Sequence, residues 1–86
     1  MDERTLRARA IRAREVLTGE TRERGLLKWL QDEVEHETGK RPSPASVHRY
    51  LADPPKRVIP PEVLKVLDTL EAEARDALRE KLKEMR

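Results

Sequence analysis

The residues best suited to binding chemistry lie between Gly39 and Asp53, around one short predicted helix. Ser43 is a good N-cap, because its hydroxyl can accept from a free N–H of the first turn, and Pro44 suits the first helical position. At about 100° per residue, the apolar side chains that share one face are Val47, Tyr50 and Leu51. The other side carries Ala45, Arg49 and Ala52, flanked by Ser46 and His48. One face is therefore expected to pack, and the other is available for binding.

The order Ser43, Ser46, Val47, Arg49, Tyr50, Leu51 resembles the recognition helix of bacterial and phage repressors, of the Cro/repressor and lac-repressor headpiece type. In that family a Ser caps the helix, a Val or Ile docks it, and an Arg points at the DNA groove. The resemblance implies a helix-turn-helix over residues 21–53 in a sequence-specific double-stranded DNA-binding regulator of phage or plasmid type. The connection from Gly39 to Ser43 is longer than the tight turn usual in this family, because Lys40, Arg41 and Pro42 intervene.

The resemblance assigns base readout to the exposed side of this helix, namely Ser43, Ala45, Ser46, His48 and Arg49. Arg49 suits guanine, because its guanidinium can donate to both the O6 and N7 acceptors. Phosphate contacts are expected from the basic residues that bracket the helix, Lys40, Arg41, Lys56 and Arg57. Between Thr38 and Val58 these cations face a single acid, whereas the whole chain has a net charge of only +2. A capped surface helix with a merely solvated basic face is the alternative.

Composition sets the remaining limits. The 86 residues are enough for one domain with a marginal core, which must be aliphatic because Phe and Cys are absent. Neither disulfides nor a Cys-based zinc site can therefore add stability. No apolar run has the length of a signal peptide or a membrane span, so we expect a cytoplasmic protein without membrane contact. High charge with few amide residues is typical of thermophiles and of GC-rich genomes.

Two helices are expected before the binding segment. The Arg-rich segment 1–20 has a helical pattern from Thr5 to Leu17, and its arginines form either an exposed helix face or a basic arm on phosphates. Gly19 marks the break, and Thr21 is a candidate N-cap for a second helix from about Arg22 to Thr38. The apolar stripe of that helix is Leu26, Leu27, Leu30 and Val34, with Trp29 at its edge and Gly39 as the C-terminal cap.

A Pro-rich connector, residues 54–61, follows the binding segment, and we expect Val58 and Ile59 to anchor it in the core. The last helix starts at Pro60 or Pro61 and runs over 61–86. Its apolar stripe is Val63, Leu67, Leu70, Ala74, Leu78, Leu82 and Met85. The distal half needs cover from the N-terminal helix or from a second subunit, and we expect Leu78, Leu82 and Met85 to form a homodimer. Exposed pairs such as Glu71 with Arg75 and Glu80 with Lys83 would add weak support.

The sequence gives no support for catalysis, because it contains no nucleophile with a base, no Gly-rich phosphate loop and no evident carboxylate pair. His36 lies among carboxylates, which is a weak match to any metal site, so neither metal nor cofactor is expected. The sequence thus predicts an all-α bundle of three to four helices with a helix-turn-helix and a long C-terminal helix. The expected function is DNA-binding regulation rather than enzymatic activity. The alternative is a small helical protein-interaction module or inhibitor that docks on a larger assembly.

Overall fold

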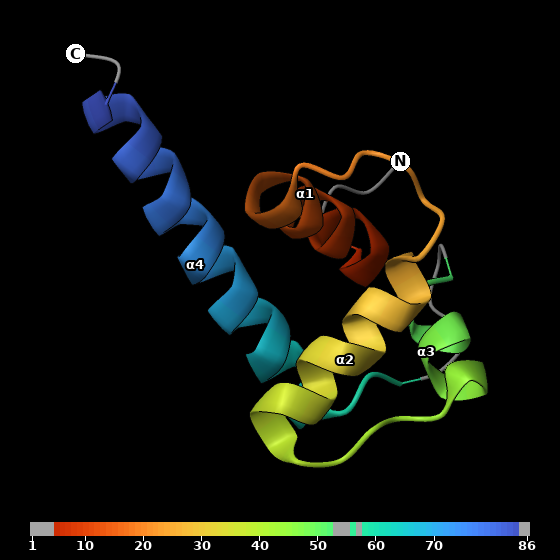
Figure 1. Cartoon of the computed structure of the whole chain (residues 1–86). Coiled ribbons are helices and arrows are strands. Elements are labelled where there is room, and N and C mark those ends of the chain that lie inside the picture. Colours follow the sequence, from red (N-terminus) through yellow and green to blue (C-terminus); the bar gives the residue numbers. More distant parts are fainter. Residues whose placement is uncertain (1–4, 53–55, 57, 85–86) are drawn as a thin grey trace.

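The computed structural model describes residues 5–52, 56 and 58–84, and within these ranges it is helical without any strand (Figure 1). The helices are α1 (Leu6–Thr18), α2 (Leu26–Thr38), α3 (Pro44–Tyr50) and α4 (Pro61–Glu84). The predicted all-α class with a long last helix is thereby confirmed. No helix among the described residues is both long and apolar enough to cross a membrane.

Local capping signals place most of the helix ends. Thr5 Oγ1 accepts from the Ala8 N–H at 3.2 Å, and Ser43 Oγ accepts from the Ser46 N–H at 3.2 Å, so both helices start with a satisfied donor. Gly39 adopts φ 80 after the last turn of α2, and its N–H donates to the Glu35 carbonyl. This left-handed conformation suits glycine, because it has no Cβ to clash. The predicted caps at Ser43 and Gly39 are confirmed.

The start of α2 differs from the sequence prediction. The helix begins at Leu26 behind Gly25, which has φ 86, and so the predicted start near Arg22 with Thr21 as N-cap is wrong. The physical reason lies in α1: the Arg14 guanidinium donates to the carbonyls of Arg22 at 2.7 Å and Arg24 at 3.1 Å. These bonds hold the segment before Gly25 as a loop against α1.

The core lies where α1, α2 and α3 meet the first half of α4. Its largest fully buried side chains are Leu30, Leu67, Leu70 and Val47. α1 supplies the buried residues Leu6, Ala10 and Ala13, and the predicted stripe of α2 supplies Leu26 and Val34. Trp29 and Ile59 are partly buried against this cluster, as packing residues. The core is therefore aliphatic, and α3 contributes to it through Val47, Tyr50 and Leu51.

The connector is anchored by one residue rather than two. Ile59 packs on the core, but Val58 is 90% exposed, so the prediction that Val58 is buried is wrong. Residues 58–60 are not helical, and Ile59 precedes a proline, which favours extended backbone, in which neighbouring side chains alternate. Burial of Ile59 therefore turns Val58 outward.

The two halves of α4 have different surroundings. Burial in α4 ends at Ala74, and the side chains of Leu78 and Leu82 are 46% and 64% exposed. In Figure 1 the distal half extends beyond the other helices, and the described part of the chain measures 44 × 31 × 22 Å. Glu71 does not serve the predicted pair with Arg75, because α1 packs here and Arg9 binds it instead. Glu80 and Lys83 do approach, at 4.0 Å. Met85 lies outside the described residues.

Candidate nucleic-acid interface

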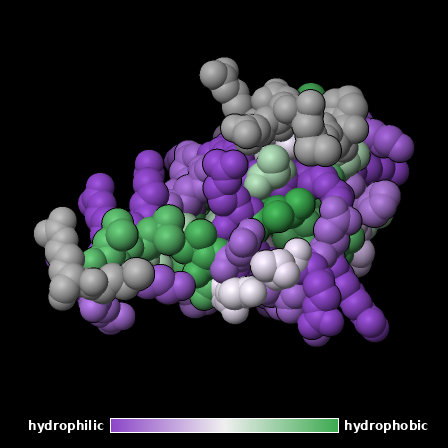
Figure 2. Space-filling view, turned by 90° about the horizontal axis from the view of Figure 1, so that it is seen from above, coloured by the Kyte–Doolittle hydropathy of each residue, from purple (hydrophilic) through white to green (hydrophobic). Residues whose placement is uncertain are grey.

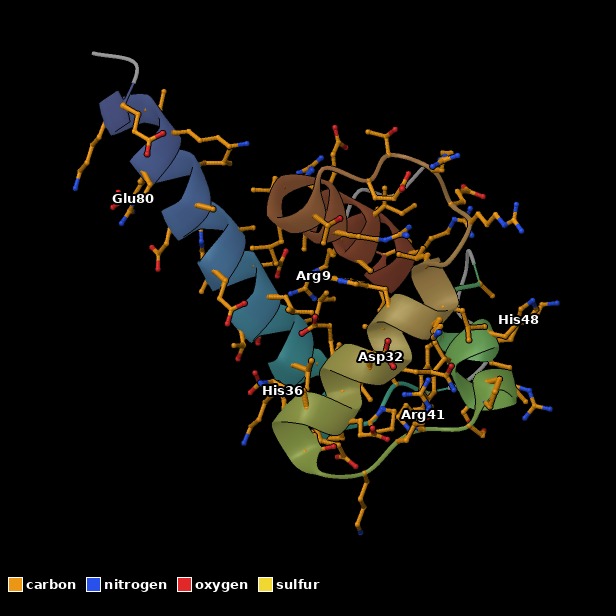
Figure 3. The ribbon with its side chains drawn as sticks, viewed as in Figure 1. Arg9, Asp32, His36, Arg41, His48 and Glu80 are labelled. Carbon is orange, nitrogen blue, oxygen red and sulfur yellow. The ribbon has the colours of Figure 1, made fainter. Side chains whose placement is uncertain are left out.

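The short helix α3 has one packed face and one free face. Val47 is 1% exposed, and Tyr50 and Leu51 are also buried, which fixes the helix on the core. Ala45, His48 and Arg49 are exposed on the other side. Figure 3 shows His48 projecting outward from α3, away from α4. The predicted division of this helix into two faces is confirmed.

The two serines of the free face are engaged with each other. Ser43 Oγ accepts from the Ser46 N–H and donates to Ser46 Oγ at 2.9 Å. Ser43 is therefore committed to capping α3, although its side chain is exposed. Ser46 is half-buried, and its hydroxyl keeps a donor for an outside partner. His48 and Arg49 carry the larger free hydrogen-bonding groups.

The connection between α2 and α3 runs back along α2 instead of making a tight turn. The Gln31 amide donates from Nε2 to the Pro42 carbonyl at 2.9 Å. Arg41 Nη1 lies 2.6 Å from Asp32 Oδ1 and 3.9 Å from Glu35 Oε1. Because both bonds reach back to the middle of α2, α3 starts beside that region rather than beside the end of α2. The longer connection between Gly39 and Ser43 thus allows α3 to start beside the middle of α2.

Gln31 is a positioning residue that sequence reasoning missed. It is 5% exposed, and its bond to Pro42 satisfies an amide that would otherwise be buried without a partner. The bonded carbonyl belongs to the residue just before the cap of α3. The available signal was that this glutamine is the only amide side chain in the sequence and directly follows the core residue Leu30.

The four residues predicted to hold phosphates stand in different positions. Lys40 is exposed at the start of the connection. Arg41 is engaged by the acids of α2, and the hydrogen bond to Asp32 raises the pKa of its guanidinium above the ordinary value. The Lys56 N–H donates to the Arg49 carbonyl at 3.2 Å, which holds this part of the connector at the end of α3. Arg57 lies outside the described residues.

A shallow hollow lies beside α3. Its volume is about 210 Å³, and His48, Leu51 and Ala52 line one side. The other side comes from the start of α2 and from an ion pair between Arg7 and Glu23. The charge of Glu23 is thereby balanced from within the chain, so this acid does not oppose an anion approaching His48.

The arginines of α1 are mostly used inside the molecule. Arg9 donates from Nε to Glu71 Oε1 at 3.1 Å and from Nη2 to Asp68 Oδ1 at 2.7 Å (Figure 3). The bond to Glu71 is the largest cause that raises the pKa of Arg9. Arg7 binds Glu23, and Arg14 binds two loop carbonyls. The helical interpretation of this segment describes α1, in which Arg12 is left exposed, and phosphate contact by these arginines stays a prediction.

The acids and His36 of α2 do not assemble into a metal centre. Within the part of the chain that the structure describes, no group of three or more His, Asp or Glu side chains could hold a metal ion. His36 is exposed in the last turn of α2. Burial and the nearby carboxylate of Glu73 raise the pKa of Glu33, which lies half-buried between α2 and α4.

Similarity to known proteins gives no guide to function, so the functional proposal rests on α3 and its surroundings. No family model, curated protein or solved structure matches this chain.

Proposed function

We propose that this chain binds double-stranded DNA sequence-specifically through the exposed face of α3, as a small transcriptional regulator of the phage or plasmid repressor type. The proposal rests on the arrangement of α3. The helix is capped by Ser43 and packed on the core through Val47, and His48 and Arg49 are exposed to solvent. A rigid helix with free donors on one side is what direct readout of the major groove requires.

The charges around α3 support an anionic partner. Lys40 precedes α3 in the chain and Lys56 follows it, and both are exposed. The bond from the Lys56 N–H to the Arg49 carbonyl keeps the connector at the end of α3. The acids of α2 nearest to this region, Asp32 and Glu35, are turned to Arg41. Exposed cations that precede and follow α3 in the chain are thus available to a phosphate backbone.

A selection from random double-stranded DNA tests the function. Duplexes retained by the protein at about 0.15 M salt are sequenced, and the enriched sequence is then compared with a scrambled duplex by gel shift. The proposal expects an enriched site bound about 10³-fold or more tighter than the scrambled duplex, as is typical of specific binders. Absence of an enriched sequence, or equal affinity for both duplexes, would contradict it.

The sequence also predicts a homodimer through Leu78, Leu82 and Met85, an interface that would compete with any other partner for Leu78 and Leu82. Two copies related by a twofold axis would read two half-sites and so gain specificity. Leu78 and Leu82 are exposed, as such an interface requires in the free chain. Readout by α3 does not depend on this interface, because a single copy can bind one half-site. Light scattering at micromolar concentration measures the mass directly.

A further inference from the structure

A second surface lies far from α3, where α1 meets the distal half of α4 (Figure 1). A groove of about 250 Å³ runs between the two helices, and its apolar lining is Ala13, Val16, Ala74 and Leu78. Leu82 continues this lining one turn further along α4, and it is the more exposed of the two leucines. Figure 2 shows the row of apolar side chains along α4. We call these five residues the α1–α4 strip.

The α1–α4 strip has a cationic border. Arg12 and Arg75 line the groove from its two helices, and both are exposed. The acid in the lining, Glu71, is bound to Arg9 and is thus neutralised. Arg79 follows Arg75 by four residues and extends the same side of α4 along the strip. An occupant of the strip therefore meets arginines on its flank.

Three further acids of α4 lie elsewhere on the helix. Glu73, Asp76 and Glu80 follow one another at spacings of three and four residues, so they form a row of their own. At about 100° per residue this row lies on the side opposite Leu78 and Leu82. Among the described residues, none of these three acids forms an ion pair with Arg12, Arg75 or Arg79.

The arginines that border the strip favour a different protein over a second copy of the chain as its partner. In an antiparallel pair of α4 helices the same flanks face each other, so Arg75 and Arg79 would meet their own counterparts. Like charges placed together disfavour an association, whereas opposite charges favour it. The apolar lining of the groove cannot bind a phosphate backbone, but it can bury the apolar face of a helix.

From the apolar lining and the flanking arginines together we infer that the α1–α4 strip binds an acidic amphipathic helix of another protein. Apolar side chains of that helix, spaced three and four residues apart, fill the groove and cover Leu78 and Leu82. Carboxylates on its flanks pair with Arg12, Arg75 and Arg79. This interaction is independent of DNA binding, because α3 takes no part in it.

The test uses a synthetic, fluorescently labelled helical peptide of about 18 residues, with Leu on one face and Glu on both flanks. One control peptide has Lys in place of Glu, and a second has Ser in place of Leu. Binding to the full chain is followed by fluorescence anisotropy. The inference expects saturable binding of the Glu/Leu peptide, and at least about 10-fold weaker binding of each control, since both charge and apolar contact contribute.

Protein variants locate the site. Arg12→Glu with Arg75→Glu should weaken the peptide at least about 10-fold, and Leu78→Ser with Leu82→Ser should do the same. The matched control is Lys28→Glu with Lys65→Glu, which changes the net charge equally at exposed positions outside the groove. This control should bind within about twofold of the parent chain, because long-range charge effects are screened. Circular dichroism verifies that every variant keeps its helices.

Three outcomes would overturn the inference. The first is no binding of the Glu/Leu peptide at about 100 μM, since a matched groove should reach that range. The second is equal weakening by the groove variant and by its charge-matched control. The third is a parent chain that sediments as a dimer and becomes a monomer on replacement of Leu78 and Leu82, which assigns the strip to a second copy.

Discussion

Arginines of the same chemistry have different surroundings in α1 and in α3. In α1, Arg9 binds two carboxylates of α4, and Arg14 binds the carbonyls of the loop before α2. In α3, Arg49 is exposed, and its own carbonyl accepts from the Lys56 N–H. Arginine density is higher in α1, yet Arg7, Arg9 and Arg14 are engaged within the molecule there, whereas Arg49 of α3 is exposed. The positions of acids and carbonyls, rather than the number of cations, separate structural arginines from available ones.

Replacement of Arg49 by Ala is expected to have the largest effect on DNA binding. Loss of a bidentate contact to one base should cost about 1–3 kcal/mol at that base pair and relax the preference there. The measurement is a gel shift with the selected site and its single-base variants. Arg12→Ala is the matched control, because it removes an exposed arginine from α1. Equal losses of DNA affinity in Arg49→Ala and Arg12→Ala would contradict the assignment of base readout to α3.

Replacement of Arg9 by Ala is expected to act on stability instead. The variant loses the bonds to Glu71 and Asp68 and the packing of the arginine stem, so the free energy of unfolding should fall by about 1 kcal/mol. Thermal denaturation followed by circular dichroism measures this change. Below the transition, affinity for DNA should equal that of the parent chain. A folded Arg9→Ala protein with weakened DNA binding would make Arg9 part of the interface.

The salt dependence of DNA binding should separate Lys40 from its neighbour Arg41. Lys40→Ala should make the slope of log affinity against log salt shallower by about 0.9, as expected for one lost phosphate contact. Arg41→Ala should change the slope less, because Asp32 already holds that guanidinium. Asp32→Asn frees Arg41 and should steepen the slope. Identical slopes for Lys40→Ala and Arg41→Ala would show that Arg41 leaves Asp32 in the complex.

The smallest expected effect concerns Glu33, a half-buried acid of α2. Its pKa is raised in the folded chain, so folding favours the protonated form, and stability falls as the pH rises through that pKa. Glu33→Gln should therefore raise the melting temperature at pH 7 and lose this advantage near pH 3, below the unfolded pKa of about 4.3. Glu15→Gln, at an exposed position of α1, is the control. A melting temperature unchanged at pH 7 would contradict this expectation.

Features that depend on neighbours in the chain could be predicted, and features that depend on distant residues could not. The caps at Ser43 and Gly39 and the buried side of α3 follow from spacing within a few residues. The start of α2 was wrong because Arg14 holds the preceding loop from another helix. The path of the α2–α3 connection depends on Gln31, which no periodic pattern marks. Readout by α3 remains a prediction, and so does the homodimer, which competes with the inferred helical partner for Leu78 and Leu82.

The bonds from Arg9 to the acids of α4 also have a consequence for the order of folding. Arg9 and Glu71 are 62 residues apart in the chain, so α1 gains this partner only after α4 has been synthesised. While α1 and α2 leave the ribosome, their apolar stripes have no α4 to cover them. Formation of the core therefore waits for the last helix, and closure of this long loop slows folding relative to a bundle with only local contacts. Arg9, whose side chain is occupied by Glu71 and Asp68, can therefore form these native bonds only when α4 is in place.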